Sequence, residues 1–125
     1  MNTYHGSCHC QAVKYEVTAK FTEGMTCNCS HCKRKGLLLA FVPQTQFTLQ
    51  SGEENLTTYH FNKKRIDHLF CKTCGVQSFA KSGDMVAINL NCLEDLDTEK
   101  LEVKKVDGKA TKKSPSDQRS KGLLK

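Results

Sequence analysis

The chain has 125 residues, of which 38% are hydrophobic and 7% aromatic, with no tryptophan, eight cysteines and a formal net charge of +6. This length predicts a single domain with a modest core, of a size that can need a metal or a disulfide for stability. The composition excludes a collagen, a coiled coil and a fully disordered chain, and no apolar run approaches the roughly 20 residues of a membrane span.

Short strand patterns separated by turn residues run along the chain. Residues 12–19 alternate apolar and polar side chains, which predicts a strand with one buried face. Residues 37–42 form the longest apolar run and predict a deeply buried strand that ends at Pro43. No long segment has the 3.6-residue apolar period of a helix, and we expect only a helical turn within residues 92–100. Further short strands are predicted at residues 47–49, 56–61, 68–70, 77–80, 85–90 and 101–103. The sequence therefore predicts a mainly β fold.

Seven of the eight cysteines fall into three tight groups. These groups are Cys8/Cys10, Cys27/Cys29/Cys32 and Cys71/Cys74. Sulfurs two or three residues apart can meet at one point, whereas a disulfide scaffold spreads its cysteines to close long loops. Residues 1–5 contain neither a basic start nor an apolar stretch, so we expect no signal peptide and a reducing, cytoplasmic compartment. Thiolates in that setting favour zinc over disulfides.

The seven clustered thiols can divide into four and three. A structural zinc site is closed by four ligands, whereas a catalytic site commonly has three protein ligands and one open position. One loop supplies three sulfurs, and the two remaining pairs could close a four-cysteine site between distant parts of the chain. Spacing alone leaves a second grouping open, a zinc ribbon built from Cys29/Cys32 with Cys71/Cys74. In either case Gly75 suits a tight turn after Cys74, because glycine readily adopts positive φ.

Charge is distributed unevenly along the chain. Residues 1–103 carry eleven basic and eleven acidic side chains, so the whole excess of +6 lies in residues 104–125. We expect a zinc-binding domain at residues 1–106 and a flexible, basic tail at residues 107–125. Such a tail can bind nucleic acid or an acidic partner, but a solubilising terminus is the favoured interpretation.

Three ordered motifs carry a family resemblance. They are GSCHCQAV at residues 6–13, CNCSHC at residues 27–32 and FCKTCG at residues 70–75. Their order and spacing closely resemble the family of glutathione-dependent formaldehyde-activating enzymes and centromere protein V, over about residues 3 to 106. Residues 68–79 look most like the centromere protein V branch.

The resemblance implies a β-tent-like fold of short antiparallel sheets stapled by zinc, with two zinc ions per chain. It also implies a carbon–sulfur lyase whose substrate is a glutathione-type or other small thiol adduct. The best-known activity of the family joins formaldehyde to glutathione as S-hydroxymethylglutathione. By resemblance, the structural zinc is held by Cys8, Cys10, Cys71 and Cys74. The catalytic zinc, with its open fourth position, is held by Cys27, Cys29 and Cys32.

Several other side chains have both a functional and a structural interpretation. Lys33, Arg34 and Lys35 could meet the carboxylates of glutathione, although a solvated basic face is the more frequent role of such a triplet. His31, inside the zinc loop, is either a proton shuttle or second-layer donor, or a spacer turned to solvent. Cys92 is interpreted as a small buried residue rather than a fourth ligand or a resolving thiol.

Two further histidines receive structural interpretations. His9 is expected to be a spacer, because the middle residue of a CxC motif points away from the metal that its neighbours hold. His68 is expected to pack or to form hydrogen bonds at the start of a hydrophobic strand.

The leading hypothesis is a cytoplasmic two-zinc lyase that acts on a small thiol adduct, without a membrane partner. The alternative is a non-catalytic, zinc-stabilised binding module whose basic tail engages nucleic acid or an acidic partner. A third, less favoured hypothesis is a redox protein that uses its CxC and CxxC pairs as dithiols. The sequence makes no prediction of the oligomeric state.

Overall fold

The computed structural model describes residues 1–60 and 66–106, so the tail predicted at residues 107–125 lies outside the described part. The strands are β1 (Asn2–Ser7), β2 (Lys14–Ala19), β3 (Glu23–Cys27), β4 (Leu39–Pro43), β5 (Phe47–Ser51), β6 (Leu56–Tyr59), β7 (Asp67–Cys71), β8 (Phe79–Ser82), β9 (Met85–Asn89) and β10 (Glu102–Val106). The helices are α1 (Ser30–Lys35) and the 3-10 turns η1 (Gln44–Gln46), η2 (Glu53–Asn55), η3 (Leu90–Cys92) and η4 (Thr98–Lys100). The predicted mainly β fold is confirmed.

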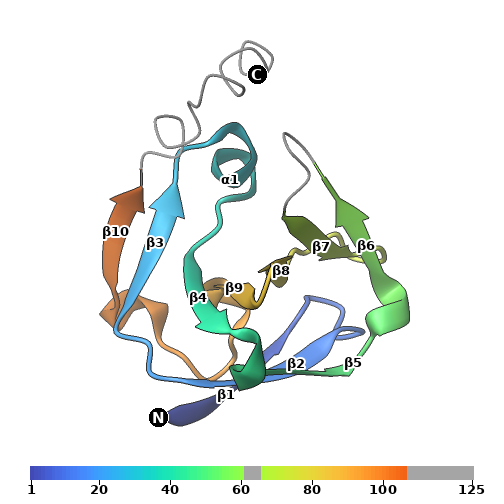
Figure 1. Ribbon diagram of the computed structural model, residues 1–125, viewed down its shortest axis with the longest axis horizontal. Coiled ribbons are helices and arrows are strands. Elements are labelled where there is room, and N and C mark those ends of the chain that lie inside the picture. Colours follow the sequence, from blue (N-terminus) through green and yellow to red (C-terminus); the bar gives the residue numbers. More distant parts are fainter. Residues whose placement is uncertain (61–65, 107–125) are drawn as a thin grey trace.

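The strands form two sheets. The smaller sheet has the order β1-β2-β5, and the larger has the order β10-β3-β4-β9-β8-β7-β6. In Figure 1, β3, β4 and β10 stand on one side and β6 and β7 on the other, while the smaller sheet lies across the base. Helix α1 lies at the end of the molecule opposite the smaller sheet, at the top of Figure 1 and next to β3.

The smaller sheet follows from the alternation seen in the sequence. Tyr15, Val17 and Ala19 of β2 are buried, and the residues between them are half-buried. Strand β1 pairs antiparallel with β2, with Tyr4 opposite Val17. The sequence does not predict β1, because Tyr4 is the only large apolar side chain in Asn2–Ser7.

The larger sheet is antiparallel except at one edge. Strand β4 ends at Pro43 as predicted and pairs along its length with β9. Strand β10 instead runs parallel to β3, with Glu102 opposite Glu23, so the larger sheet is mixed at this edge. Lys104, grouped by its charge with the tail, lies within this strand, and its Nζ is 3.5 Å from Oε1 of Glu23.

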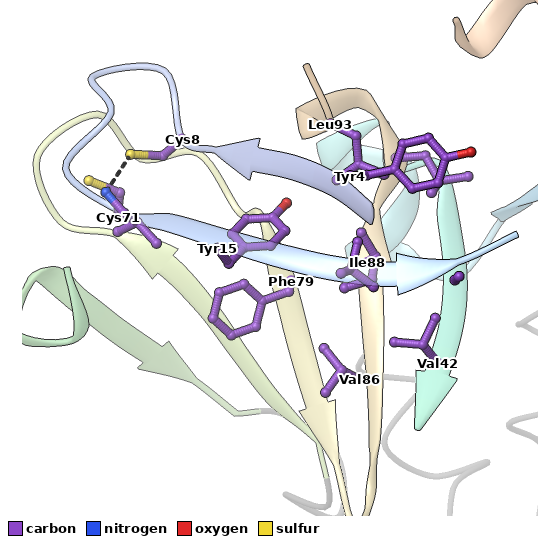
Figure 2. Close-up of a cluster of buried hydrophobic side chains, with 13 residues drawn as sticks. Tyr4, Cys8, Tyr15, Val42, Cys71, Phe79, Val86, Ile88 and Leu93 are labelled. Atoms are coloured by element: carbon purple, nitrogen blue, oxygen red, sulfur yellow. Dashed lines mark hydrogen bonds between the residues drawn. The ribbon is translucent and has the colours of Figure 1, made fainter. Parts of the chain in front are cut away.

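The core lies between the two sheets. Tyr15 contributes the largest fully buried side chain, and its ring packs edge-on against Phe79 with centroids 5.5 Å apart. Figure 2 shows Val86 and Ile88 further along this cluster, and Cys8 and Cys71 at its end. Two cysteines thus belong to the apolar core and to a cysteine group at the same time. The cysteine group is therefore anchored in the close-packed core.

In the described part of the chain, helical structure consists of short segments. The turn expected within residues 92–100 is confirmed by η4. Helix α1 is missing from the sequence predictions, because its six residues are too few to show an apolar period and none of them is buried. Across residues 1–60 and 66–106, no helix has the length and apolar character needed to cross a membrane.

Candidate metal centres

The first cysteine cluster joins two distant turns. Cys8 and Cys10 lie in the turn between β1 and β2, Cys71 ends β7, and Cys74 lies in the turn that follows. The four sulfurs all lie within 4.8 Å of one another. The structure therefore brings the Cys8/Cys10 pair together with the Cys71/Cys74 pair, as in the division of the seven thiols into four and three. The ribbon grouping of Cys29/Cys32 with Cys71/Cys74 does not form, since these pairs belong to separate clusters.

Both turns contain a residue with positive φ. Gly75 has a φ of 79°, as predicted, and its N–H donates to the carbonyl of Cys71 over 2.7 Å. In the other turn Gln11 has a φ of 69°, and its N–H donates to the carbonyl of Cys8 over 3.1 Å. A glutamine with positive φ is uncommon, and the sequence gives no indication of this conformation at Gln11. In each turn the chain reverses so that both cysteines face the same point.

Hydrogen-bond donors surround these sulfurs. The N–H of Val13 donates to Sγ of Cys8 over 3.4 Å, and Nδ2 of Asn55 donates to Sγ of Cys71 over 3.0 Å. Burial acts to raise the pKa of Cys71, but hydrogen bonds from the backbone N–H groups of Cys74 and Thr73 lower it to about 6. Donors aimed at sulfur favour the thiolate, which is the form that binds metal.

The four sulfurs repel one another when they are charged. A backbone hydrogen bond at Ala12 acts to lower the pKa of Cys10, but desolvation and the sulfurs of Cys71 and Cys8 raise it to about 11. The pKa of Cys10 thus moves in the opposite direction from that of Cys71, because close thiols do not all ionise without a cation between them.

Sulfur spacing in this cluster suits a tetrahedral metal. The Sγ atoms of Cys8 and Cys10 are 3.7 Å apart, and those of Cys10 and Cys71 are 3.6 Å apart. Four sulfurs at the usual zinc–sulfur distance of about 2.3 Å lie roughly 3.8 Å from one another. The first cluster therefore fits a closed four-thiolate site.

The second cluster is local. Cys27 ends β3, Cys29 caps the N-terminus of α1 and Cys32 lies within that helix, and the three sulfurs lie within 4.8 Å of one another. The N–H of Cys32 donates to Sγ of Cys29 over 3.4 Å. Gly36, with a φ of 63°, ends the helix and donates its N–H to the carbonyl of Cys32 over 3.0 Å. The loop is also tied to β10, because the N–H of Asn28 donates to the carbonyl of Val106.

Three sulfurs at one point again disfavour full ionisation. Hydrogen bonding to Cys29 and then burial raise the pKa of Cys32 strongly, and burial raises the pKa of Cys27. A bound cation would reverse these shifts by stabilising the thiolates. Three protein ligands leave a fourth position for another group, which distinguishes this cluster from the closed one.

Two hollows lie along helix α1, the helix that contains Cys32 of the second cluster. They enclose about 340 Å³ and 360 Å³, open to solvent, and both are lined by His31, Lys35 and Tyr59. Ser30 and Arg34 complete one hollow, and Phe70 and Gly75 complete the other. The residues come from α1, from β6 and from the region of β7 and its turn. These hollows are called the α1 groove below.

His31 forms one wall of the α1 groove. Its ring stacks on Tyr59 with centroids 5.8 Å apart and lies 4.1 Å from the ring of His68. The interpretation of His31 as a spacer turned to solvent is therefore wrong. His68 is buried and packed, as predicted. His9 is exposed between its two cysteines, in agreement with its role as a spacer.

The remaining candidates divide by position. All three residues of the basic triplet are exposed; Arg34 and Lys35 line the α1 groove, and Lys33 does not. Cys92 is half-buried, lies outside both clusters, and has its pKa raised by burial, which agrees with a structural thiol. The sequence predictions omit Tyr59, because only the pairing of β6 with β7 places it opposite α1.

A larger hollow of about 540 Å³ lies elsewhere, between residues 19–25 and residues 39–42. Its lining includes apolar side chains such as Phe21 and Phe41; among the described residues that line it, Glu23 is the only acidic one and none is a cysteine or histidine. It offers no cluster of metal ligands, so the chemistry of this protein points to the α1 groove instead.

Fold and sites together define a small β protein with two cysteine clusters that can hold metal ions. The family described as glutathione-dependent formaldehyde-activating enzyme matches residues 3–107, and the chain belongs to this family. A crystal structure of a Rhodobacter sphaeroides protein is similar to this chain, with 32% sequence identity and a TM-score of 0.75. That similarity covers 82% of this chain and 99% of the other. Neither comparison distinguishes the centromere protein V branch from the rest of the family. Membership of that branch stays a prediction from sequence.

Proposed function

We propose that the protein is a zinc-dependent carbon–sulfur lyase that forms or cleaves S-hydroxymethyl adducts of a small thiol. The observation that carries this proposal is the position of the three-cysteine cluster, whose helix forms one side of the α1 groove. Family membership supports an enzyme that activates formaldehyde with a thiol. If the protein lies in the reducing cytoplasm that the sequence predicts, both clusters would stay in the thiol form.

The two clusters have different roles in this proposal. Cys8, Cys10, Cys71 and Cys74 would hold a structural zinc, because four thiolates close the coordination sphere. Cys27, Cys29 and Cys32 would hold the catalytic zinc and leave a position for substrate. When bound, this second zinc supplies a Lewis acid that lowers the pKa of a thiol or polarises an oxygen.

The proposed reaction balances with two reactants and one product. The thiol sulfur bonds to the carbonyl carbon of formaldehyde, the carbon–oxygen π bond breaks, and the thiol proton ends on the oxygen. The reverse reaction cleaves the same carbon–sulfur bond and returns the proton to sulfur. The groove beside α1 would hold the thiol near the cluster.

The test is to measure zinc content and adduct exchange in protein purified under reducing conditions without chelators. Exchange between glutathione and its hydroxymethyl adduct can be followed by NMR against the spontaneous rate. We expect about two zinc ions per chain and a faster exchange than in buffer. Replacement of Cys29 by alanine should remove the acceleration and about one zinc, while the fold is retained.

Cys92→Ala is the matched control, since it removes a thiol outside both clusters. It should retain both zinc ions and the acceleration. An exchange rate equal to that of buffer for the zinc-loaded protein, with several small thiols, would refute the proposal. One zinc per chain without acceleration would instead favour the non-catalytic binding module.

A further inference from the structure

Helix α1 meets the larger sheet through one of its metal-ligating residues. None of the six residues of α1 is buried, so the helix has no apolar face that would hold it in place. Cys32 packs against a small buried cluster that includes Ala80 of β8 and Ala87 of β9. A helix this short is not stable on its own, so its orientation depends on such contacts with the sheet.

A hydrogen bond from Lys35 ties the last turn of α1 to the same sheet. Nζ of Lys35 donates to Oε1 of Gln77 over 2.8 Å and lies 5.0 Å from the centre of the Phe70 ring. Lys35 follows Cys32 by three positions, and side chains at this spacing lie on one face of a helix. The face of α1 that carries Cys32 is therefore the face that Gln77 holds.

Gln77 is a firm anchor for this bond. The residue is 4% exposed, and its backbone carbonyl accepts a hydrogen bond of 3.0 Å from Nδ2 of Asn89. Asn89 is the last residue of β9, and its own N–H donates to the carbonyl of Ser78 over 2.9 Å. The backbone at Gln77 is thus fixed by the sheet. A buried amide in such a position retains its hydrogen bond, because loss of the partner would leave it unsatisfied.

The bond also fixes a positive charge near the three-cysteine cluster. Three thiolates bound to one divalent zinc ion carry a net negative charge. Burial lowers the pKa of Lys35, and the charge of Cys32 opposes this shift, so the ammonium and the sulfur attract each other. A cation held in place at this point favours the thiolate form, which is the form that binds metal.

We propose that Gln77 is a positioning residue for the three-cysteine centre, which it serves through Lys35 by holding the ammonium one helical turn from Cys32. Gln77 is not a member of either cysteine cluster. Without its amide oxygen, α1 would lose a bond to the sheet and the thiolates would lose a fixed counter-charge. The inference rests on the proposed function only in that this cluster holds zinc.

The affinity of the full chain for zinc, measured by competition with a chromogenic chelator, tests this inference. Gln77→Met removes the amide oxygen with little change in side-chain volume and should weaken zinc binding at the three-cysteine cluster by about tenfold. Lys35→Met, at an exposed position, should have the same effect. The double variant should also lose about tenfold, whereas two independent effects would give about a hundredfold loss.

Three controls separate positioning from a general structural role. Cys29→Ala leaves only the four-cysteine cluster complete, and in that background Gln77→Met should not change the affinity for the remaining zinc. Lys33→Met removes an exposed charge from the same helix and should bind zinc as the wild type does. Lys35→Arg keeps the charge and an N–H donor, so it should retain most of the affinity.

Four results would overturn the inference. They are wild-type zinc affinity in Gln77→Met, an equal loss at both clusters, additive losses in the double variant, and a wild-type chain that binds one zinc ion. If Gln77→Met does not fold, wild-type affinity in Lys35→Met would overturn it as well.

The proposed function is judged separately, from turnover. If the two-zinc protein exchanges no adduct faster than buffer, but Gln77→Met weakens the three-cysteine site alone, the lyase proposal fails and the role of Gln77 stands. If exchange is fast and Gln77→Met binds both zinc ions as the wild type does, the lyase proposal stands and the role of Gln77 fails.

Discussion

Nδ2 of Asn55 donates a hydrogen bond of 3.0 Å to Sγ of Cys71, although the two residues belong to different elements, η2 and β7. The same amide contacts Oγ1 of Thr73 over 3.0 Å. Asn55 therefore fixes both the charge and the orientation of a sulfur in the four-cysteine cluster, as second-layer donors do around structural metals.

Replacement of Asn55 by alanine should weaken zinc binding at the four-cysteine cluster by about 10- to 100-fold, because the thiolate of Cys71 loses its side-chain donor. The change can be measured by competition with a chromogenic chelator. Asn91→Ala, an exposed asparagine outside both clusters, is the control and should bind zinc as the wild type does. Equal affinities in the two variants would contradict this role of Asn55.

The two clusters should differ in their effect on stability. Cys71 is fully buried at the end of the core, and its cluster joins the β1–β2 turn to the turn after β7. Structural zinc contributes about 10–16 kcal/mol in small domains, which is comparable to the whole stability of about 5–15 kcal/mol. Cys71→Ala should therefore unfold the protein at room temperature, as judged by circular dichroism and NMR dispersion.

Cys29→Ala provides the comparison for this experiment. The three-cysteine cluster lies within one short loop, so its loss should leave the two sheets folded. Similar unfolding of both variants would contradict the division into a structural and a catalytic site.

Gly6 allows the ring of Tyr15 to lie close to the backbone of β1. A Cβ at this position would lie 2.3 Å from Cζ of Tyr15, whose side chain is fully buried. Gly6→Ala should destabilise the protein by about 1–3 kcal/mol, because the Tyr15 ring has no space to move. Urea denaturation measures this loss directly.

A double-mutant cycle tests whether Tyr15 is the cause. In a Tyr15→Leu background the Gly6→Ala change should cost less, with a coupling energy of about 0.5–3 kcal/mol. Additive effects of the two substitutions would mean that the Tyr15 ring does not set the requirement for glycine.

His5 links β1 to the segment after η3 in a pH-dependent way. Its backbone N–H and its Nδ1 contact the carboxylate of Asp95 at 3.0 and 3.1 Å, and its Nε2 lies 3.3 Å from Glu16. The hydrogen bond with Asp95 raises the pKa of His5 above its ordinary value of 6.5. Desolvation acts to raise the pKa of Asp95, but hydrogen bonds from His5 lower it below 3.8.

These shifts define a pH window. The protonated His5 contributes its stability in full below pH 6.5, and this contribution is lost as the pH rises through the higher pKa of the folded state. The contribution of Asp95 is present above pH 3.8 and is lost as the pH falls through its lowered pKa. The urea midpoint of His5→Gln should therefore differ most from the wild type between pH 3.8 and 6.5, by a small amount because the site is exposed. Asp95→Asn should show the same window, and parallel pH profiles in all three proteins would rule out this pair as the cause.

The sequence determined the features that depend on near neighbours. Residues 14–19 alternate because one face of β2 is buried, and Pro43 marks the end of β4 because proline lacks the N–H that a continuing strand requires. Spacing within each cysteine group is also local, so the turn at Gly75 and the metal-binding character of the three groups follow from the motifs.

The sequence did not predict the elements that bury few side chains. Strand β3 (Glu23–Cys27) buries only Gly24 fully, and its position depends on pairing with β4 and β10. Helix α1 begins at Ser30 because Cys29 caps it and ends because Gly36 adopts a left-handed conformation. Capping by a cysteine is a weak signal in a sequence without an apolar period.

Only the tertiary structure decided which groups meet. Spacing allowed Cys71 and Cys74 to join either of the other cysteine groups, and the choice was made by the packing of the β1–β2 turn against the end of β7. The contact between Lys35 and Gln77 likewise joins residues 42 positions apart through the alignment of α1 with the larger sheet. Long-range contacts of this kind depend on the closure of loops and on the burial of a shared core, and neither is encoded in the spacing of neighbouring residues.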